Sequence, residues 1–298
     1  MLFGYATLSL AGESPVCEKG GFTKSGYGMP DVKAKQRPIL PDWRPHPYSV
    51  IPLLVMKSEG ITQGIFTYLL DYDKTMTING GCFFIKGVEG HNILVDTGPT
   101  VEDFVAHGYP CEGIKTMPEA LKEATGLTVD DIDIVILTQL HHDHCPLAGV
   151  FKNAQLIIQQ DEWHAVHNSP ACYRFLYNPE YLEGVNPTLV DGDVFDILPG
   201  IHLLYTPGHT PGGQSVVIDA EEGRVIICGF CCNEGNFNPP EELKSLWPEA
   251  LVPGLHVNSE DAYESAMRVK KAADYIITLH DPKTYERGAC PGPRWPKY

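Results

Sequence analysis

The chain has 298 residues, of which 43% are hydrophobic and 20% are charged, which is typical of a folded protein with a large core. The formal net charge is −16 and lysine and arginine form no run, so we expect neither a nucleic-acid nor a membrane partner. The apolar stretches are too short to span a membrane. The nine cysteines are not spaced like a disulfide framework, and no signal peptide is apparent. These features predict a cytoplasmic protein.

Residues 1–48 differ in composition from the remainder of the chain. They are rich in glycine, proline and lysine, with four prolines between residues 38 and 47 and Trp43 among them. Prolines at this density favour an extended arm over a helix or a central strand. Two interpretations stay open: a loosely ordered tail, or an arm that docks on the active-site mouth or on a partner subunit. The second would permit a homodimer.

The sequence pattern becomes regular from residue 49, where we place the start of a domain covering residues 49–298. Segments rich in β-branched and aromatic residues predict strands at 50–56, 64–70, 76–85 and 92–95. A helix is predicted over residues 117–125, with Pro118 near its start and Gly126 as its stop. The continuous apolar run at 132–137 predicts a strand that is buried on both faces.

The second half of the domain repeats this alternation. We expect a short helix, a strand at 156–159 and a helix over 162–167, followed by an aromatic segment at 170–187 that we interpret as an insertion or lid. Strands are predicted at 201–205, 215–219, 225–228 and 275–279, with a helix that starts at Ser259 as its N-cap before the last of them. Two strand-rich halves predict two sheets packed face to face and flanked by helices.

The segment 138–145, Thr-Gln-Leu-His-His-Asp-His-Cys, follows directly on the predicted buried strand. Imidazole and carboxylate side chains together suit zinc, iron or manganese. Titratable groups gathered at the end of a buried strand are costly unless a partner satisfies them, and a cation does so directly. We therefore predict a metal site here rather than a polar surface turn.

Two further histidines follow predicted strands. His209 lies on the turn Thr-Pro-Gly-His-Thr-Pro-Gly-Gly at 206–213, and His280 directly follows the strand at 275–279. Either histidine alone would be interpreted as an ordinary loop residue. Three such strand ends together predict a convergent site, because metal sites collect ligands from loops that a rigid sheet carries.

These motifs, in this order and with Asp96-Thr97-Gly98 before them, resemble those of the metallo-β-lactamase superfamily. The resemblance runs from about residue 49 to about residue 282. The turn at 206–213 and the pair Asn236-Phe237 are similar to the N-acyl homoserine lactonase-like branch. The resemblance implies an α/β fold, specifically an αββα sandwich of two mixed β-sheets flanked by helices, with the metal site at one edge of the sheets.

The resemblance also implies a set of ligands. It places a first metal site on Gln139, His141 and His209, and a second site on Asp143, His144 and His280. The family's bridging carboxylate falls on Phe230, and the substrate-binding tyrosine of the branch falls on Asn233. Glutamine offers only a neutral oxygen, which is a weak ligand for zinc, and phenylalanine offers none.

Both departures weaken the first site. We therefore expect a single ion at the second site, assisted by His141 or His209, as the leading alternative to a dinuclear centre. Zinc is the expected cofactor, although two histidines and a carboxylate with open positions also suit iron, and manganese stays open. The thiols of Cys231 and Cys232 are interpreted as buried groups, with a thiolate ligand as the alternative.

Three residues are catalytic candidates: Asp143, His142 and Asn233. Asp143 would bind metal and orient the nucleophile. His142 is either a core side chain or a proton shuttle beside the site. The leaving oxygen needs a donor, for which Asn233, His142 or a lid tyrosine are the candidates, and Asp96 is expected to orient a motif histidine.

The resemblance implies a metal-dependent hydrolase that acts on a small lactone or ester-like molecule through metal-activated water. One scaffold hosts many reactions, so two alternatives stay open. The first is another metalloenzyme, such as a thioesterase, a hydrolytic dehalogenase or an iron-dependent oxidoreductase. The second is a non-catalytic descendant that binds a small ligand.

Overall fold

The computed structural model describes residues 40–298. The chain divides into two units, 1–38 and 39–298, and most of the predicted arm at 1–48 lies outside the described residues. The end of that arm is part of the folded unit: the Trp43 indole donates to the Ala220 carbonyl at 3.0 Å, and Tyr48 is buried. No helix in the described range is long and apolar enough to cross a membrane.

The first sheet has seven strands in the spatial order β4-β1-β2-β3-β5-β6-β7. Its antiparallel half pairs β1 with β2 and β4, and β2 with β3, whereas β3, β5, β6 and β7 run parallel to one another. The strands are β1 (Ser49–Thr62), β2 (Thr75–Lys86), β3 (Ile93–Val95), β4 (Glu112–Gly113), β5 (Ile134–Ile136), β6 (Gln155–Gln159) and β7 (Thr188–Val190).

The second sheet has five strands in the order β12-β11-β10-β9-β8. All of its neighbouring pairs are antiparallel except β11 and β12, which run parallel. The strands are β8 (Val194–Leu198), β9 (Ile201–Tyr205), β10 (Gln214–Ala220), β11 (Gly223–Ile227) and β12 (Tyr275–Ile277). Both sheets are therefore mixed.

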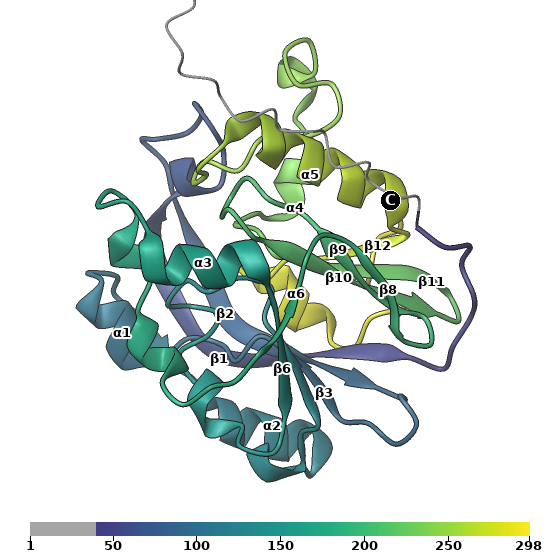
Figure 1. The fold of residues 1–298 in the computed structure, drawn as a ribbon. Helices are drawn as coiled ribbons and strands as arrows, with labels where there is room; N and C mark the ends of the chain where they lie inside the picture. Colours follow the sequence, from purple (N-terminus) through teal and green to yellow (C-terminus); the bar gives the residue numbers. More distant parts are fainter. Residues whose placement is uncertain (1–39) are drawn as a thin grey trace, which may run out of the picture. The chain divides into compact units, whose positions relative to one another are not determined.

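Buried apolar side chains form three layers. Phe83 and Ile136 of the first sheet share one cluster with Val216 and Ile227 of the second, so the two sheets pack face to face. A second cluster covers the outer face of the first sheet and includes Met117. A third packs β9, β10 and β11 against α5 (Ser259–Ala272), which Figure 1 shows across the outer face of that sheet. This arrangement confirms the predicted αββα sandwich.

Short helices connect the strands. They are α1 (Val101–Ala106), α2 (Met117–Thr125), α3 (Gln160–Asn168), α4 (Glu234–Phe237) and α6 (Pro282–Arg287), with 3-10 turns at η1 (Gln63–Ile65), η2 (Val129–Asp131), η3 (Ala148–Val150), η4 (Arg174–Leu176), η5 (Pro179–Leu182) and η6 (Glu241–Leu243). The predicted helix at 117–125 is confirmed. Its N-cap Thr116 forms a capping box with Glu119, and Gly126 ends it in the left-handed conformation.

Two local predictions are wrong. Residues 64–70 form η1 and a turn instead of a strand, because Leu69 (φ 61°) and Asp71 (φ 52°) leave the extended region of backbone conformation. The N-cap of α5 is Asn258, whose side chain accepts from the Glu260 and Asp261 amides, so Ser259 is the first helical residue. Helices α1 and α6 and strands β7 and β8 had no sequence-based prediction.

Candidate metal centre

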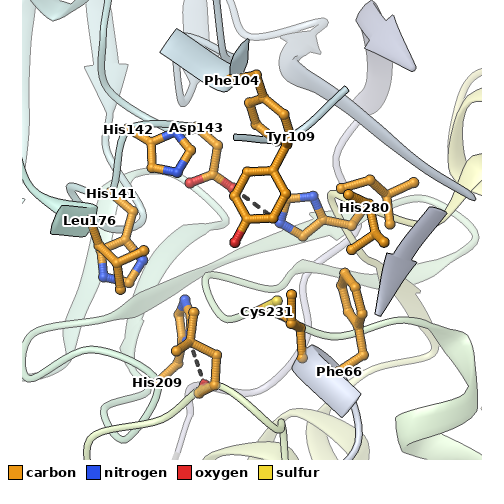
Figure 2. A pocket seen from close by; sticks show the side chains of 14 residues that line it. Phe66, Phe104, Tyr109, His141, His142, Asp143, Leu176, His209, Cys231 and His280 are labelled. Atoms are coloured by element: carbon orange, nitrogen blue, oxygen red, sulfur yellow. Dashed lines mark hydrogen bonds and ion pairs between the residues drawn. The ribbon is translucent and has the colours of Figure 1, made fainter. Parts of the chain in front are cut away.

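The sequence-predicted ligands follow the ends of three strands. His141, Asp143 and His144 lie on the loop after β5, His209 lies on the turn after β9, and His280 follows β12. The four histidines are all at least 96% buried. Figure 2 shows His141, Asp143, His209 and His280 converging on one pocket. The structure therefore brings together residues that are up to 139 positions apart in the sequence.

Asp143, His144 and His280 form the tightest group. One ligand atom from each lies within 4.8 Å of the other two. Asp143 Oδ2 is 3.2 Å from His280 Nε2 and 3.6 Å from His144 Nε2. Two atoms bound to one zinc ion at about 2.0–2.1 Å in tetrahedral geometry lie roughly 3.3–3.4 Å apart. The spacing of these three side chains therefore fits a single zinc-sized ion.

His144 is held by the buried carboxylate of Asp96, which follows β3. Asp96 Oδ2 lies 2.8 Å from His144 Nδ1, and the same carboxylate accepts from the Thr138 amide at 2.7 Å and the Thr138 hydroxyl at 2.8 Å. A carboxylate can only accept, so Nδ1 carries the proton and the Nε2 lone pair faces the Asp143 group. Such an outer partner fixes the ring orientation and tautomer of a metal-binding histidine.

Gln139 is fully buried and contacts His144 instead of the pocket. Its Nε2 lies 2.8 Å from His144 Nε2, and its Oε1 accepts from the His141 amide at 3.1 Å. The amide thus donates to the same lone pair that a metal ion would use. In this arrangement the Gln139 amide competes with a metal ion for the His144 Nε2 lone pair. The sequence had instead suggested that Gln139 is a weak metal ligand.

His141 and His209 face each other across the pocket. Their ring centroids are 4.9 Å apart and the rings are nearly perpendicular. His209 Nδ1 donates to the Leu255 carbonyl at 2.7 Å, which leaves its Nε2 as the acceptor nitrogen. The structure places no third nitrogen or oxygen ligand from Gln139 or Phe230 beside this pair, so it offers fewer donors than the Asp143 group.

The charges of the site depend on burial and on neighbouring carboxylates. Burial lowers the pKa of His209 to about 4 and holds the pKa of His141 well below its ordinary value. Both imidazoles are therefore neutral at pH 7, the form that binds metal. Burial also opposes charge on His144, but the Asp143 and Asp96 carboxylates outweigh burial and raise its pKa to about 9. This position attracts a cation, which is either a proton or a metal ion.

Glu162 of α3 connects two ligand-bearing loops and was not identified from the sequence. Its carboxylate accepts from the Leu140 amide at 3.0 Å and the Gly212 amide at 2.9 Å, and Tyr177 donates to it at 3.3 Å. A Cβ at Gly212 would lie 2.0 Å from the Glu162 amide nitrogen, so only glycine permits this approach. In the sequence, Glu162 looks like an ordinary surface carboxylate at the start of a helix. Only its burial in the structure identifies it as the acceptor that joins the two loops.

The pocket around the candidate metal ligands is mostly apolar. Its other lining residues are Ile61, Ile65, Phe66, Ile78, Phe104, Tyr109, His142, Leu176, Cys231 and Leu255. Leu176 comes from the predicted lid at 170–187, so that segment supplies part of the wall. Phe104 and Tyr109 were not identified from the sequence, because helix α1 and the turn after it have no recognised sequence signal.

His142 also lines the pocket, and it stacks on His107. The two ring centroids are 3.7 Å apart with planes 8° from parallel, and His142 Nδ1 is buried without a hydrogen-bond partner among the described residues. The His142 amide donates to the Leu176 carbonyl at 2.9 Å. His142 is thus both buried and part of the pocket wall, and its role as a proton shuttle stays a prediction.

Asn233, Phe230 and Cys232 lie elsewhere. Asn233 is the N-cap of α4 and lines a separate surface hollow together with Met76 and Asp281. Phe230 and Cys232 pack in the apolar layer outside the second sheet. Of the neighbouring thiols Cys231 and Cys232, only Cys231 lines the candidate metal pocket, and burial raises its pKa well above the usual value.

Two packed mixed sheets with histidine and aspartate side chains gathered on their strand-end loops are the arrangement expected of a metallohydrolase-type fold. The metallo-beta-lactamase superfamily model matches residues 79–229. An N-acyl homoserine lactonase of Bacillus thuringiensis is 32% identical over 225 residues, which cover 70% of this chain and 83% of that protein. The chain belongs to the metallo-β-lactamase superfamily, as the motifs predicted.

Solved structures agree on the fold. An N-acyl homoserine lactone hydrolase with the product N-hexanoyl-L-homoserine bound at its catalytic metal centre matches with a TM-score of 0.62 and 24% identity, over 81% of this chain and 95% of that chain. AidC, a dizinc quorum-quenching lactonase, matches with a TM-score of 0.59 and 17% identity, over 86% of this chain and 96% of that chain. The likeness to lactonase-like hydrolases therefore extends from sequence to fold.

Proposed function

We propose that this protein is a metal-dependent hydrolase that opens a small lactone, with an N-acyl homoserine lactone as the first substrate to test. The observation that carries the proposal is the group of Asp143, His144 and His280, whose ligand atoms lie within 4.8 Å of one another beside an apolar pocket. The identity to a B. thuringiensis lactonase supports the choice of substrate. The apolar walls suit the acyl chain of such a molecule.

We assign the metal to Asp143, His144 and His280, with His141 and His209 beside it. Zinc is our proposed ion, in agreement with the imidazole and carboxylate ligands and with the dizinc relative AidC. We propose one ion per chain because Gln139 contacts His144 and supplies no third ligand beside His141 and His209. When bound, such an ion lowers the pKa of water and polarises a carbonyl group.

The protein's own residues then orient the reactants. Asp96 holds the tautomer of His144, and Glu162 holds the Leu140 and Gly212 amides, so the loops that carry His141 and His209 keep a fixed relation. Apolar side chains such as Phe66 and Leu255 exclude bulk water from the pocket.

We place the protein in the cytoplasm, because every cysteine in the described range is unpaired.

The test measures acid release from N-hexanoyl-L-homoserine lactone by pH-stat titration. Zinc-loaded protein is expected to turn over, metal-stripped protein to be inactive, and Asp143→Ala to lose activity by about 100-fold or more. Asp73→Ala, at an exposed position outside the pocket, is the matched control. A metal-loaded protein that releases no acid, or an Asp143→Ala variant with full activity, would contradict the proposal.

A further inference from the structure

A phenol group reaches the metal pocket from the turn after α1. Tyr109 is the one tyrosine among the residues that line the pocket. Figure 2 shows its hydroxyl pointing into the space near Asp143, His209 and His280. No residue within 40–298 forms a hydrogen bond to this hydroxyl, so its donor is available to a molecule in the pocket.

The local sequence fixes the position of Tyr109. The Tyr109 amide donates to the Phe104 carbonyl at 3.0 Å, and the Gly108 amide donates to the Val105 carbonyl at 3.0 Å. These two bonds, with Gly108 at φ 84°, form the Schellman motif that ends α1. A hydrophobic contact between the two ends of the motif often accompanies it, and here the Tyr109 and Phe104 ring centroids lie 5.6 Å apart. The phenol is therefore placed by a helix end and by aromatic packing.

The other hydroxyl and side-chain amide donors considered for this role are already used or lie elsewhere. The hydroxyls of the lid tyrosines Tyr173, Tyr177 and Tyr181 donate to the His256 carbonyl, Glu162 and Asp103, respectively. Asn233 lies at the start of α4, outside the pocket. Tyr109 is thus the hydroxyl in the described pocket that remains free to contact a substrate oxygen.

We propose that Tyr109 is a catalytic residue of this site and donates its O–H as a hydrogen bond to the oxygen that leaves the acyl carbon. The inference rests on the proposed lactone hydrolysis. In that reaction the oxygen of water bonds to the acyl carbon and the bond from that carbon to the ring oxygen breaks. One proton of water ends on the departing oxygen, and the second is released when the new carboxyl group ionises. Tyr109 keeps its proton and stabilises the negative charge that develops on the departing oxygen.

The first test compares Tyr109→Phe with Tyr48→Phe, a control whose hydroxyl donates to the Pro199 carbonyl and does not line the pocket. Two substrates differ in their need for a donor: N-hexanoyl-L-homoserine lactone has a poor leaving group, and 4-nitrophenyl hexanoate has a good one. Tyr109→Phe is expected to lower kcat about 100-fold for the lactone and less than about 3-fold for the ester, with KM and metal content unchanged. Equal losses on both substrates, or no loss on the lactone, would overturn the inference.

A second variant tests the turn that places the phenol. Gly108→Ala keeps Tyr109 but adds a Cβ at a left-handed position, where nothing within 4 Å obstructs it sterically. We expect a loss of lactone kcat between those of Tyr48→Phe and Tyr109→Phe, with metal content unchanged. Unchanged lactone turnover would contradict the placement of Tyr109 by this turn.

A binding measurement separates this inference from the proposed function. The ring-opened product N-hexanoyl-L-homoserine carries the hydroxyl oxygen that Tyr109 contacts. Calorimetry is expected to show about 2- to 10-fold weaker product binding by Tyr109→Phe. If the wild-type protein hydrolyses no lactone but binds the product more tightly than Tyr109→Phe does, the donor role stands and the proposed hydrolysis fails. If hydrolysis occurs but neither kcat nor product binding depends on Tyr109, only the donor role fails. An absence of both hydrolysis and binding would overturn both.

Discussion

Asp96 Oδ2 lies 2.8 Å from His144 Nδ1, with both side chains buried at the end of the first sheet. The carboxylate makes Nε2 the nitrogen that faces Asp143 and His280. This contact therefore determines whether His144 is able to serve as a metal ligand at all.

Asp96→Asn is expected to weaken zinc binding about 10- to 100-fold. An asparagine whose oxygen keeps the Thr138 contacts turns its NH₂ group toward His144 Nδ1, which favours the tautomer with the proton on Nε2. Competition with a chromophoric chelator measures the affinity, and exposed Asp73→Asn is the control. Wild-type affinity in the Asp96→Asn protein would show that the contact does not orient the ligand.

Gln139→His is expected to raise the metal content from about one to about two ions per chain after reconstitution with zinc. The new imidazole would join the facing pair of His141 and His209 and complete a set of three nitrogen ligands. Elemental analysis of the purified proteins measures the ratio, with Gln155→His at an exposed strand position as the control. Two ions in the wild-type protein, or one in the variant, would contradict this explanation of Gln139.

Glu162→Ala is expected to destabilise the fold by about 2–5 kcal/mol, because the buried Leu140 and Gly212 amides lose their acceptor. Glu162→Gln retains one acceptor oxygen and should lose less, whereas Glu183→Ala, at an exposed position, should change little. Urea denaturation measures these differences. Stability of Glu162→Ala equal to that of the wild-type protein would show that the carboxylate does not hold the two loops.

Several site residues could be predicted because the chemistry is local in sequence. Residues 141–144 lie directly after a recognisable buried strand, and His209 and His280 occupy similar strand ends. Tyr109 and Glu162 could not be predicted. Tyr109 depends on how the short helix α1 ends, and Glu162 depends on a close approach between α3 and the turn at Gly212. Such tertiary contacts leave no periodic signal in a single sequence.

The same limit explains the errors in the fold. Residues 64–70 have the composition of a strand, but two non-glycine residues with positive φ turn the chain there. The predicted helix at 117–125 was correct because its capping box and its terminal glycine are local features. The strand ends that carry the histidines and the cap and terminal glycine of α2 were therefore predictable, and long-range contacts were not.

The stability contributed by Asp219 is expected to depend on pH. Burial opposes ionisation of this carboxyl, but the facing His202 and Arg224 side chains outweigh burial and lower its pKa below the ordinary 3.8. A lowered pKa in the folded state means that the unfolded chain binds more protons, so the contribution is present above pH 3.8 and is lost as the pH falls through the lowered value. The difference in urea midpoint between wild type and Asp219→Asn should shrink below about pH 4. A difference that stays constant from pH 7 to pH 3 would contradict this assignment.

A zinc titration of the metal-stripped protein tests the central claim most directly, with lactone hydrolysis and bound metal measured in the same samples. The proposed site of Asp143, His144 and His280 predicts that hydrolysis of N-hexanoyl-L-homoserine lactone rises in proportion to bound zinc and saturates at about one ion per chain. Hydrolysis by the metal-free protein, or no hydrolysis at saturating zinc, would contradict a metal-dependent lactone hydrolase.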